Sequence, residues 1–121
     1  MAMSVTATEI THTSAKKITL VWVSAADGSA SGATTSAYDG GIMGLITIPA
    51  AAGAAPTDNY DITVSDADGH DVLLGAGANR DTANTEYVLG TSLAAVAGSK
   101  LTLAVANAGD TKGGTVIVWI R

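Results

Sequence analysis

The sequence predicts an all-β protein, a single β-sandwich of about eight or nine short strands. Three observations support this fold class. Apolar residues recur with a period of two, and glycine-containing turn sequences separate the runs. The apolar residues are mainly Ala, Val, Ile and Leu, since aromatics make up 4% of the 121 residues and Phe is absent. A jelly-roll-like sandwich is favoured, with an immunoglobulin-like one as the alternative, because the cysteine pair of immunoglobulin domains is missing.

Alternation is clearest in two segments. In residues 100–107, Leu101, Leu103 and Val105 alternate with smaller residues, and residues 60–65 (YDITVS) repeat the pattern. Such alternation is typical of strands with one buried face. Further runs predict strands at residues 5–13, 17–24, 34–38, 44–49, 71–74, 86–89 and 114–121.

Turn-forming residues lie between these runs. Glycine and aspartate tolerate the backbone conformations that tight turns require. Predicted turns are Asp27-Gly28, Asp39-Gly40-Gly41, Asp68-Gly69 and Gly113-Gly114. The Asp68-Gly69 pair favours a two-residue hairpin. We expect residues 49–56 (PAAAGAAP) to cross the surface and residues 92–97 to form a short helical turn.

The length fits one domain, which we place at residues 16–121 behind an N-terminal extended arm or edge strand at 1–15. Net charge is −5, and Lys16, Lys17 and Arg121 account for half of the six basic residues. This balance predicts no binding to nucleic acid or to anionic membranes. No apolar run is long enough to span a bilayer, and the N-terminus does not resemble a signal peptide. We therefore expect synthesis in the cytoplasm.

The richest cluster of potential ligands is Asp66-Ala-Asp68-Gly69-His70-Asp71. Oxygen-rich clusters suit calcium, but here the glycine comes too early for an EF-hand loop and the closing glutamate is absent. A turn in which the aspartates accept hydrogen bonds from backbone amides is the favoured interpretation. His12 and His70 have no nearby nucleophile motif, and residues 75–79 (GAGAN) lack a phosphate-binding lysine. We expect no catalytic residues, no metal, no cofactor and no enzymatic activity.

Two segments are apolar on both faces. In the last strand Val116, Val118 and Ile120 face one way, and Ile117 and Trp119 the other; in the second, Ile18, Leu20 and Trp22 oppose Val21 and Val23. A sandwich has one interior, so the second face needs another cover. We predict that Val21, Val23, Ile117 and Trp119 form an interface, with a fold-over of residues 49–56 as the alternative.

From about Lys16 to the C-terminus, the chain resembles small virion structural proteins of tailed bacteriophages. The resemblance lies in four segments: ITLVWVSAADGSASGATT, GGIMGLITIP, P-x-x-x-YDITVSDADG-x-DVL-x-G-x-GAN and LAVANAGDTKGGTVIVWIR. These are strand and turn patterns that cover most of the chain, and they carry no catalytic residues. The resemblance implies capsid decoration (cement) proteins or components of the neck and tail.

The leading functional hypothesis is therefore a capsid decoration protein that binds and stabilises the assembled head shell. Its expected partners are copies of itself, such as a trimer, and the major capsid protein or another virion protein. Its expected location is the virion, assembled in the host cytoplasm. The alternatives are a neck, tail or fibre-attachment module, and a carbohydrate- or calcium-binding module.

Overall fold

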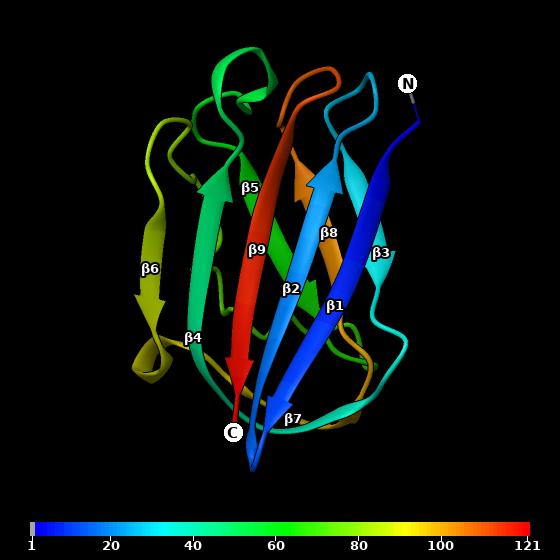
Figure 1. Ribbon diagram of the computed structural model, residues 1–121, viewed down its shortest axis with the longest axis vertical. Helices are drawn as coiled ribbons and strands as arrows, with labels where there is room; N and C mark the ends of the chain where they lie inside the picture. Colours follow the sequence, from blue (N-terminus) through cyan, green and yellow to red (C-terminus); the bar gives the residue numbers. More distant parts are fainter. Residues whose placement is uncertain (1) are drawn as a thin grey trace.

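Two antiparallel sheets make up the structure, a computed structural model that describes residues 2–121 (Figure 1). The larger sheet has six strands and is curled into a half-barrel; its order is β1-β2-β9-β4-β6, with β7 paired to the far end of β4. The smaller sheet has the order β3-β8-β5. The protein is therefore all-β, as predicted.

The strands are short, apart from one that reaches 12 residues. Their bounds are Ser4–His12 (β1), Ala15–Val23 (β2), Ala30–Ala33 (β3), Tyr38–Pro49 (β4), Asp61–Ser65 (β5), Glu86–Leu89 (β6), Ala95–Ser99 (β7), Thr102–Ala106 (β8) and Gly113–Ile120 (β9). Two single-turn 3-10 helices, η1 (Ala52–Ala54) and η2 (Gly90–Ser92), are the only helices among residues 2–121. Neither has the length or apolar character needed to cross a membrane.

The core lies between the two sheets, and the alternation seen in the sequence determines which side chains enter it. On β2 and β9, the residues predicted to share a face are at most 1% exposed: Ile18, Leu20, Trp22, Val116, Val118 and Ile120. Leu103 and Val105 of β8 meet them from the smaller sheet, within the same hydrophobic cluster. Both predicted face assignments are therefore confirmed.

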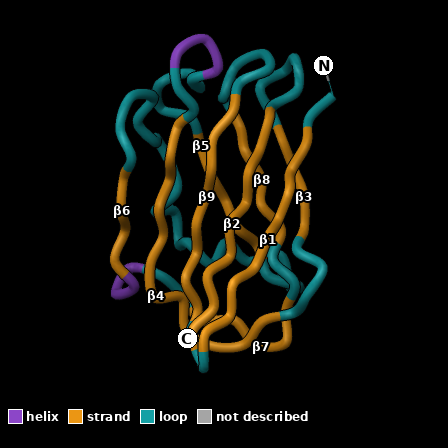
Figure 2. Tube along the Cα trace, in the orientation of Figure 1, coloured by secondary structure: helices purple, strands orange, loops and turns teal. Residues whose placement is uncertain are grey.

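Three predicted elements are wrong. Residues 34–38 are mostly loop, and the strand of this region is β3 at Ala30–Ala33. Residues 71–74 form a turn, because the Asp71 carboxylate accepts hydrogen bonds from the amides of Leu73 and Gly75, both at 3.0 Å. Residues 92–97 are not helical beyond η2, and β7 begins at Ala95. Figure 2 shows the long loop that joins β5 to β6 without a strand.

Two glycine-rich segments predicted as turns instead lie inside strands. Asp39-Gly40-Gly41 belongs to the bulged first part of β4, and Gly113-Gly114 begins β9. A Cβ on Gly40 would lie 2.6 Å from the Arg121 carbonyl oxygen, and one on Gly114 2.8 Å from the Trp22 ring. Glycine is therefore needed at both places for close packing rather than for reversing the chain.

Candidate functional site

The candidate site is the solvent-facing side of the larger sheet, here called the outer face. Its large apolar members come from four adjacent strands, and the register places them side by side: Val21 and Val23 (β2), Ile117 and Trp119 (β9), Ile46 and Ile48 (β4), Tyr87 and Leu89 (β6). Each alternates along its strand with a residue that points into the core. No second layer formed by residues 2–121 covers them in Figure 1.

The four residues predicted as an interface all lie on the outer face. Val21 is 47% exposed, and Val23, Ile117 and Trp119 are partly exposed. Val21 lies opposite Thr115 and Ile117 opposite Thr19, so these two apolar side chains are diagonal neighbours across β2 and β9. Trp119 lies farther along β9, opposite Lys17. The structure thus brings the four residues onto one surface.

The predicted interface did not include the part of the outer face on β4 and β6. Ile46 lies opposite Ile117 on one side and opposite Tyr87 on the other, which continues the apolar surface across the sheet. Tyr87 is 56% and Leu89 64% exposed. The available signal was the alternation within residues 44–49 and 86–89, but the pairing of β6 with β4 is not a local property of the sequence.

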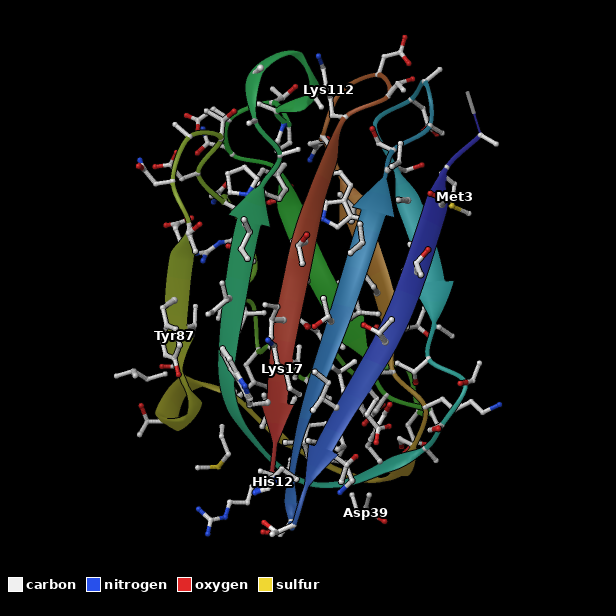
Figure 3. All side chains as sticks on the ribbon, viewed as in Figure 1. Met3, His12, Lys17, Asp39, Tyr87 and Lys112 are labelled. Atoms are coloured by element: carbon white, nitrogen blue, oxygen red, sulfur yellow. The ribbon has the colours of Figure 1, made fainter. Side chains whose placement is uncertain are left out.

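An aromatic pair occupies the lower part of the outer face. The rings of Tyr87 and Trp119 lie 5.9 Å apart at an interplanar angle of 34°. Gly44 lies between their strands, and a Cβ there would come within 2.8 Å of the Tyr87 hydroxyl and 3.2 Å of the Trp119 ring. The absence of a side chain at Gly44 therefore lets the two rings meet across β4. They border a hollow of about 340 Å³ with Met43 and Arg121. Figure 3 shows Tyr87 on β6, at the margin of the larger sheet.

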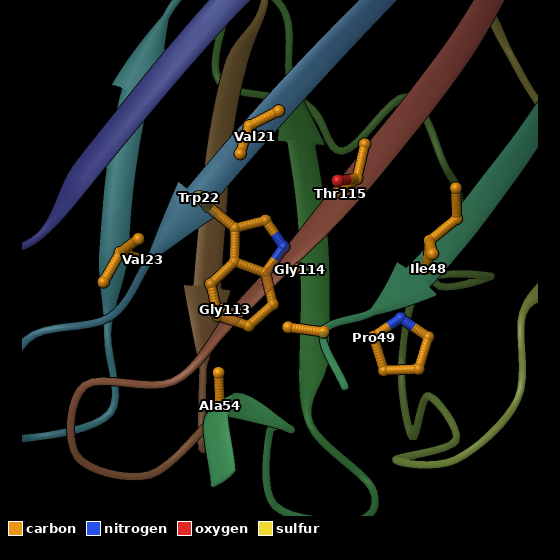
Figure 4. A pocket seen from close by; sticks show the side chains of 10 residues that line it. Val21, Trp22, Val23, Ile48, Pro49, Ala54, Gly113, Gly114 and Thr115 are labelled. Carbon is orange, nitrogen blue, oxygen red and sulfur yellow. The ribbon is translucent and has the colours of Figure 1, made fainter. Parts of the chain in front are cut away.

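A second hollow of about 340 Å³ lies at the upper end of the outer face (Figure 4). Val21, Val23 and Ile48 line it, and the glycines at the start of β9 open it toward the Trp22 ring. Ala54 of η1 forms part of its wall. Residues 49–56 therefore border the outer face at this end. They leave Val21 exposed, and the alternative of a loop folded over the patch is wrong.

The outer face carries little charge. Lys17 points outward from β2 beside Trp119, and no Asp or Glu occupies an outward position of β2, β9, β6 or residues 44–48 of β4. The chain has eleven acidic residues against six basic ones, so its negative charge is concentrated elsewhere. Binding of an apolar partner surface to the outer face would therefore bury no carboxylate, and the large free-energy cost of desolvating one would not arise.

The aspartate-rich segment at 66–71 is a hydrogen-bonded turn, as favoured from the sequence. The Asp66 carboxylate accepts hydrogen bonds from the amides of Asp68 and His70, both at 3.0 Å. The Asp71 carboxylate likewise accepts hydrogen bonds from the amides of Leu73 and Gly75. Within residues 2–121, no three His, Asp or Glu side chains are grouped as they would be to hold a metal ion.

The remaining candidates from the sequence lie on separate segments of the chain. His12 lies at the end of β1, beside the turn to β2, and His70 lies in the loop after β5; both are exposed. Residues 75–79 form turns, with Gly77 buried against the Ile62 carbonyl. Neither imidazole belongs to a group of three His, Asp or Glu side chains that could hold a metal ion within residues 2–121.

The sequence matches no protein-family model, and a search of curated proteins finds no significant match.

Proposed function

We propose that this protein is a structural component of a tailed-bacteriophage virion, a capsid decoration protein that binds the assembled head shell through its outer face. It acts by binding and not by catalysis. The resemblance of residues 16–121 to small virion proteins supports this class. The observation that carries the proposal is the uncovered apolar surface formed by β2, β9, β4 and β6.

The size of this surface favours a binding role. An aromatic side chain buries about 150–250 Å², and burial contributes roughly 25 cal/mol per Å² of apolar area. The outer face combines two aromatic and six aliphatic side chains, so its apolar area reaches several hundred Å², in the range of functional patches on monomers. Contact with a shell protein would remove this area from water.

We also propose that the two sheets form a jelly roll. From β2 to β6 each successive strand lies in the other sheet; β6 and β7 are then consecutive in the larger sheet, β8 returns to the smaller one and β9 to the larger one. Repeated crossing between two facing sheets is typical of jelly rolls, which occur in viral capsid proteins. The immunoglobulin-like alternative keeps more consecutive strands within one sheet.

Stabilisation of the shell would follow from mass action. A protein that binds only the assembled state stabilises it by RT ln(1 + [L]/Kd) at each site. Many equivalent sites on one shell multiply this effect. Weak individual contacts are therefore sufficient, which suits a surface with few hydrogen-bonding groups.

The variant Trp119→Asp tests the proposal. It places a carboxylate within the apolar outer face, and we expect an unchanged far-UV circular dichroism spectrum with at least a hundredfold loss of capsid binding. The matched control is Thr63→Asp, on the exposed side of β5 in the smaller sheet, which should bind normally. Normal capsid binding by Trp119→Asp would refute the assignment of the outer face.

Copy number separates decoration from the neck or tail alternative. Quantified gel bands of purified virions should give hundreds of copies for a decoration protein. A count of tens of copies or fewer per virion would instead favour a neck, tail or fibre-attachment protein. The outer face would still be the proposed contact surface.

A further inference from the structure

The strand β1 forms one edge of the larger sheet and is exposed almost throughout. It pairs only with β2, from Ser4 opposite Val23 to His12 opposite Ala15. Of its nine residues, only Val5 is partly buried, against Gly32 of β3. Figure 1 shows β1 at the margin of the sheet, diverging from β3 below this contact. The other edge of β1 is thus open along most of its length.

Three of the usual protective features are missing from β1. Natural edge strands are usually kept from pairing by proline, by lysine, by a bulge or by short length. The sequence SVTATEITH contains neither proline nor lysine, and its register with β2 is continuous. Its one acidic residue, Glu9, accepts a hydrogen bond from the Tyr38 hydroxyl at 2.8 Å. The carboxylate is therefore held beneath the sheet and leaves the edge free.

The hairpin geometry identifies the open backbone groups. Two residues, Thr13 and Ser14, join the paired His12 and Ala15, and Thr13 has φ +54°. The pair that closes a two-residue hairpin is hydrogen-bonded, and such pairs then alternate along an antiparallel ladder. Even-numbered residues of β1 therefore bond to β2. The amide and carbonyl groups of Ala7, Glu9 and Thr11 point to the open edge.

We propose that a second copy of this chain adds its own β1 antiparallel to this edge, about a twofold axis at Thr8. Thr8 is the midpoint of β1, so this register pairs all nine residues and is self-complementary, as a symmetric dimer requires. It places Glu9 opposite Ala7 of the second copy and so avoids a like-charge pair. It also pairs the open backbone groups of Ala7 with those of Glu9 of the second copy, and those of Thr11 with those of Val5.

The dimer joins the two larger sheets into one. In this register outward residues lie opposite outward residues, so Thr6 pairs with Ile10 of the second copy. Ile10 is 64% exposed in the single chain, and the pairing extends the outer faces of both copies over one continuous side. The inference does not depend on the proposed virion role, because it concerns the isolated protein.

Proline scanning tests which backbone groups are used. Ala7→Pro removes an amide that faces the open edge, and Thr8→Pro removes one that bonds to β2. We expect concentration-dependent dimers of the unmodified chain in analytical ultracentrifugation, and folded monomers of Ala7→Pro. Thr8→Pro should instead lower the melting temperature. An unmodified chain that stays monomeric at millimolar concentration would overturn the proposal, as would a trimer or a folded, dimeric Ala7→Pro.

Cysteine crosslinking tests the register without relying on proline. The chain has no cysteine, so Thr8→Cys introduces a single thiol that meets its own copy across the twofold axis. We expect mild oxidation to give a disulfide-linked dimer of Thr8→Cys. Thr6→Cys and Ile10→Cys should crosslink efficiently only when mixed. Equal crosslinking of Thr63→Cys, an exposed position on β5, would show that contact is non-specific and the register wrong.

Discussion

The two sheets share one core but differ in their outward sides. The outward side of the smaller sheet carries small and polar residues, among them Asp61, Thr63 and Ser65 of β5 and Thr102 and Ala104 of β8. The outer face of the larger sheet has valine, isoleucine, tyrosine, leucine and tryptophan at equivalent strand positions. A low content of charged residues therefore does not explain the apolar outer face, because the same chain builds a polar surface on its other sheet.

The proposed function assigns the outer face to contact rather than to stability. Neighbouring residues on one strand should then differ sharply in what they contribute to folding. Substitutions on the inner side should lower stability, and those on the outer face should lower binding alone.

The largest difference in stability is expected between substitutions at two neighbouring residues of β2, one inward and one outward. Leu20→Ala creates a cavity in the core and should cost about 3 kcal/mol in the free energy of unfolding. Val21→Ala, at a half-exposed position, should change it by less than about 0.5 kcal/mol. Urea denaturation monitored by circular dichroism measures both. Equal losses would show that the outer face is covered within the folded chain.

A smaller effect is expected at the start of β9, where the inner and outer sides of the sheet meet. Gly114→Ala would push a Cβ against the Trp22 ring and the Ile48 carbonyl oxygen, at 2.8 and 2.9 Å. We expect a loss of about 1–3 kcal/mol, typical of overpacking. Gly53→Ala is the control, since a Cβ there meets nothing within 4 Å. Thermal unfolding of both variants gives the comparison.

The last effect concerns pH and involves only the core side of the sheets. Burial raises the pKa of Tyr60 to about 12, and burial together with the hydrogen bond to Glu9 raises the pKa of Tyr38 to about 12. Unfolded tyrosines titrate near 10, so above that pH the unfolded chain binds fewer protons than the folded one. Stability is therefore fully present below pH 10 and is lost as pH rises toward 12.

Calorimetry can measure this loss directly. Between pH 9 and 11, the melting temperature should fall by about 5–10 °C. Tyr60→Phe keeps the aromatic ring beside Trp22, whose centroid lies 5.7 Å from that of Tyr60. Because it removes one of the two phenols, it should make the fall in melting temperature smaller without abolishing it. An unchanged pH dependence in both Tyr60→Phe and Tyr38→Phe would contradict the assignment of the loss to these phenols.

Much of the fold was predictable because strand alternation is local. The inward residues of β2 and β9, the two-faced character of these strands and the hydrogen-bonded turn at Asp66 all follow from nearby residues. Glycine misled the prediction at residues 39–41 and 113–114, because the same residue serves a turn and a close approach between strands. The predicted strand at residues 71–74 was also wrong, because the Asp71 carboxylate accepts hydrogen bonds from the amides of Leu73 and Gly75 and so holds these residues in a turn.

The sequence by itself determined the all-β class and which side chains of β2 and β9 point out of the core. Only the tertiary structure decided which strands became neighbours. It placed β6 beside β4, so that Tyr87 reaches Trp119 across Gly44, and it left β1 as an open edge. The reason is physical: a strand's two faces follow from the pleat of its own backbone, whereas its partners are selected by contacts between residues far apart in the chain.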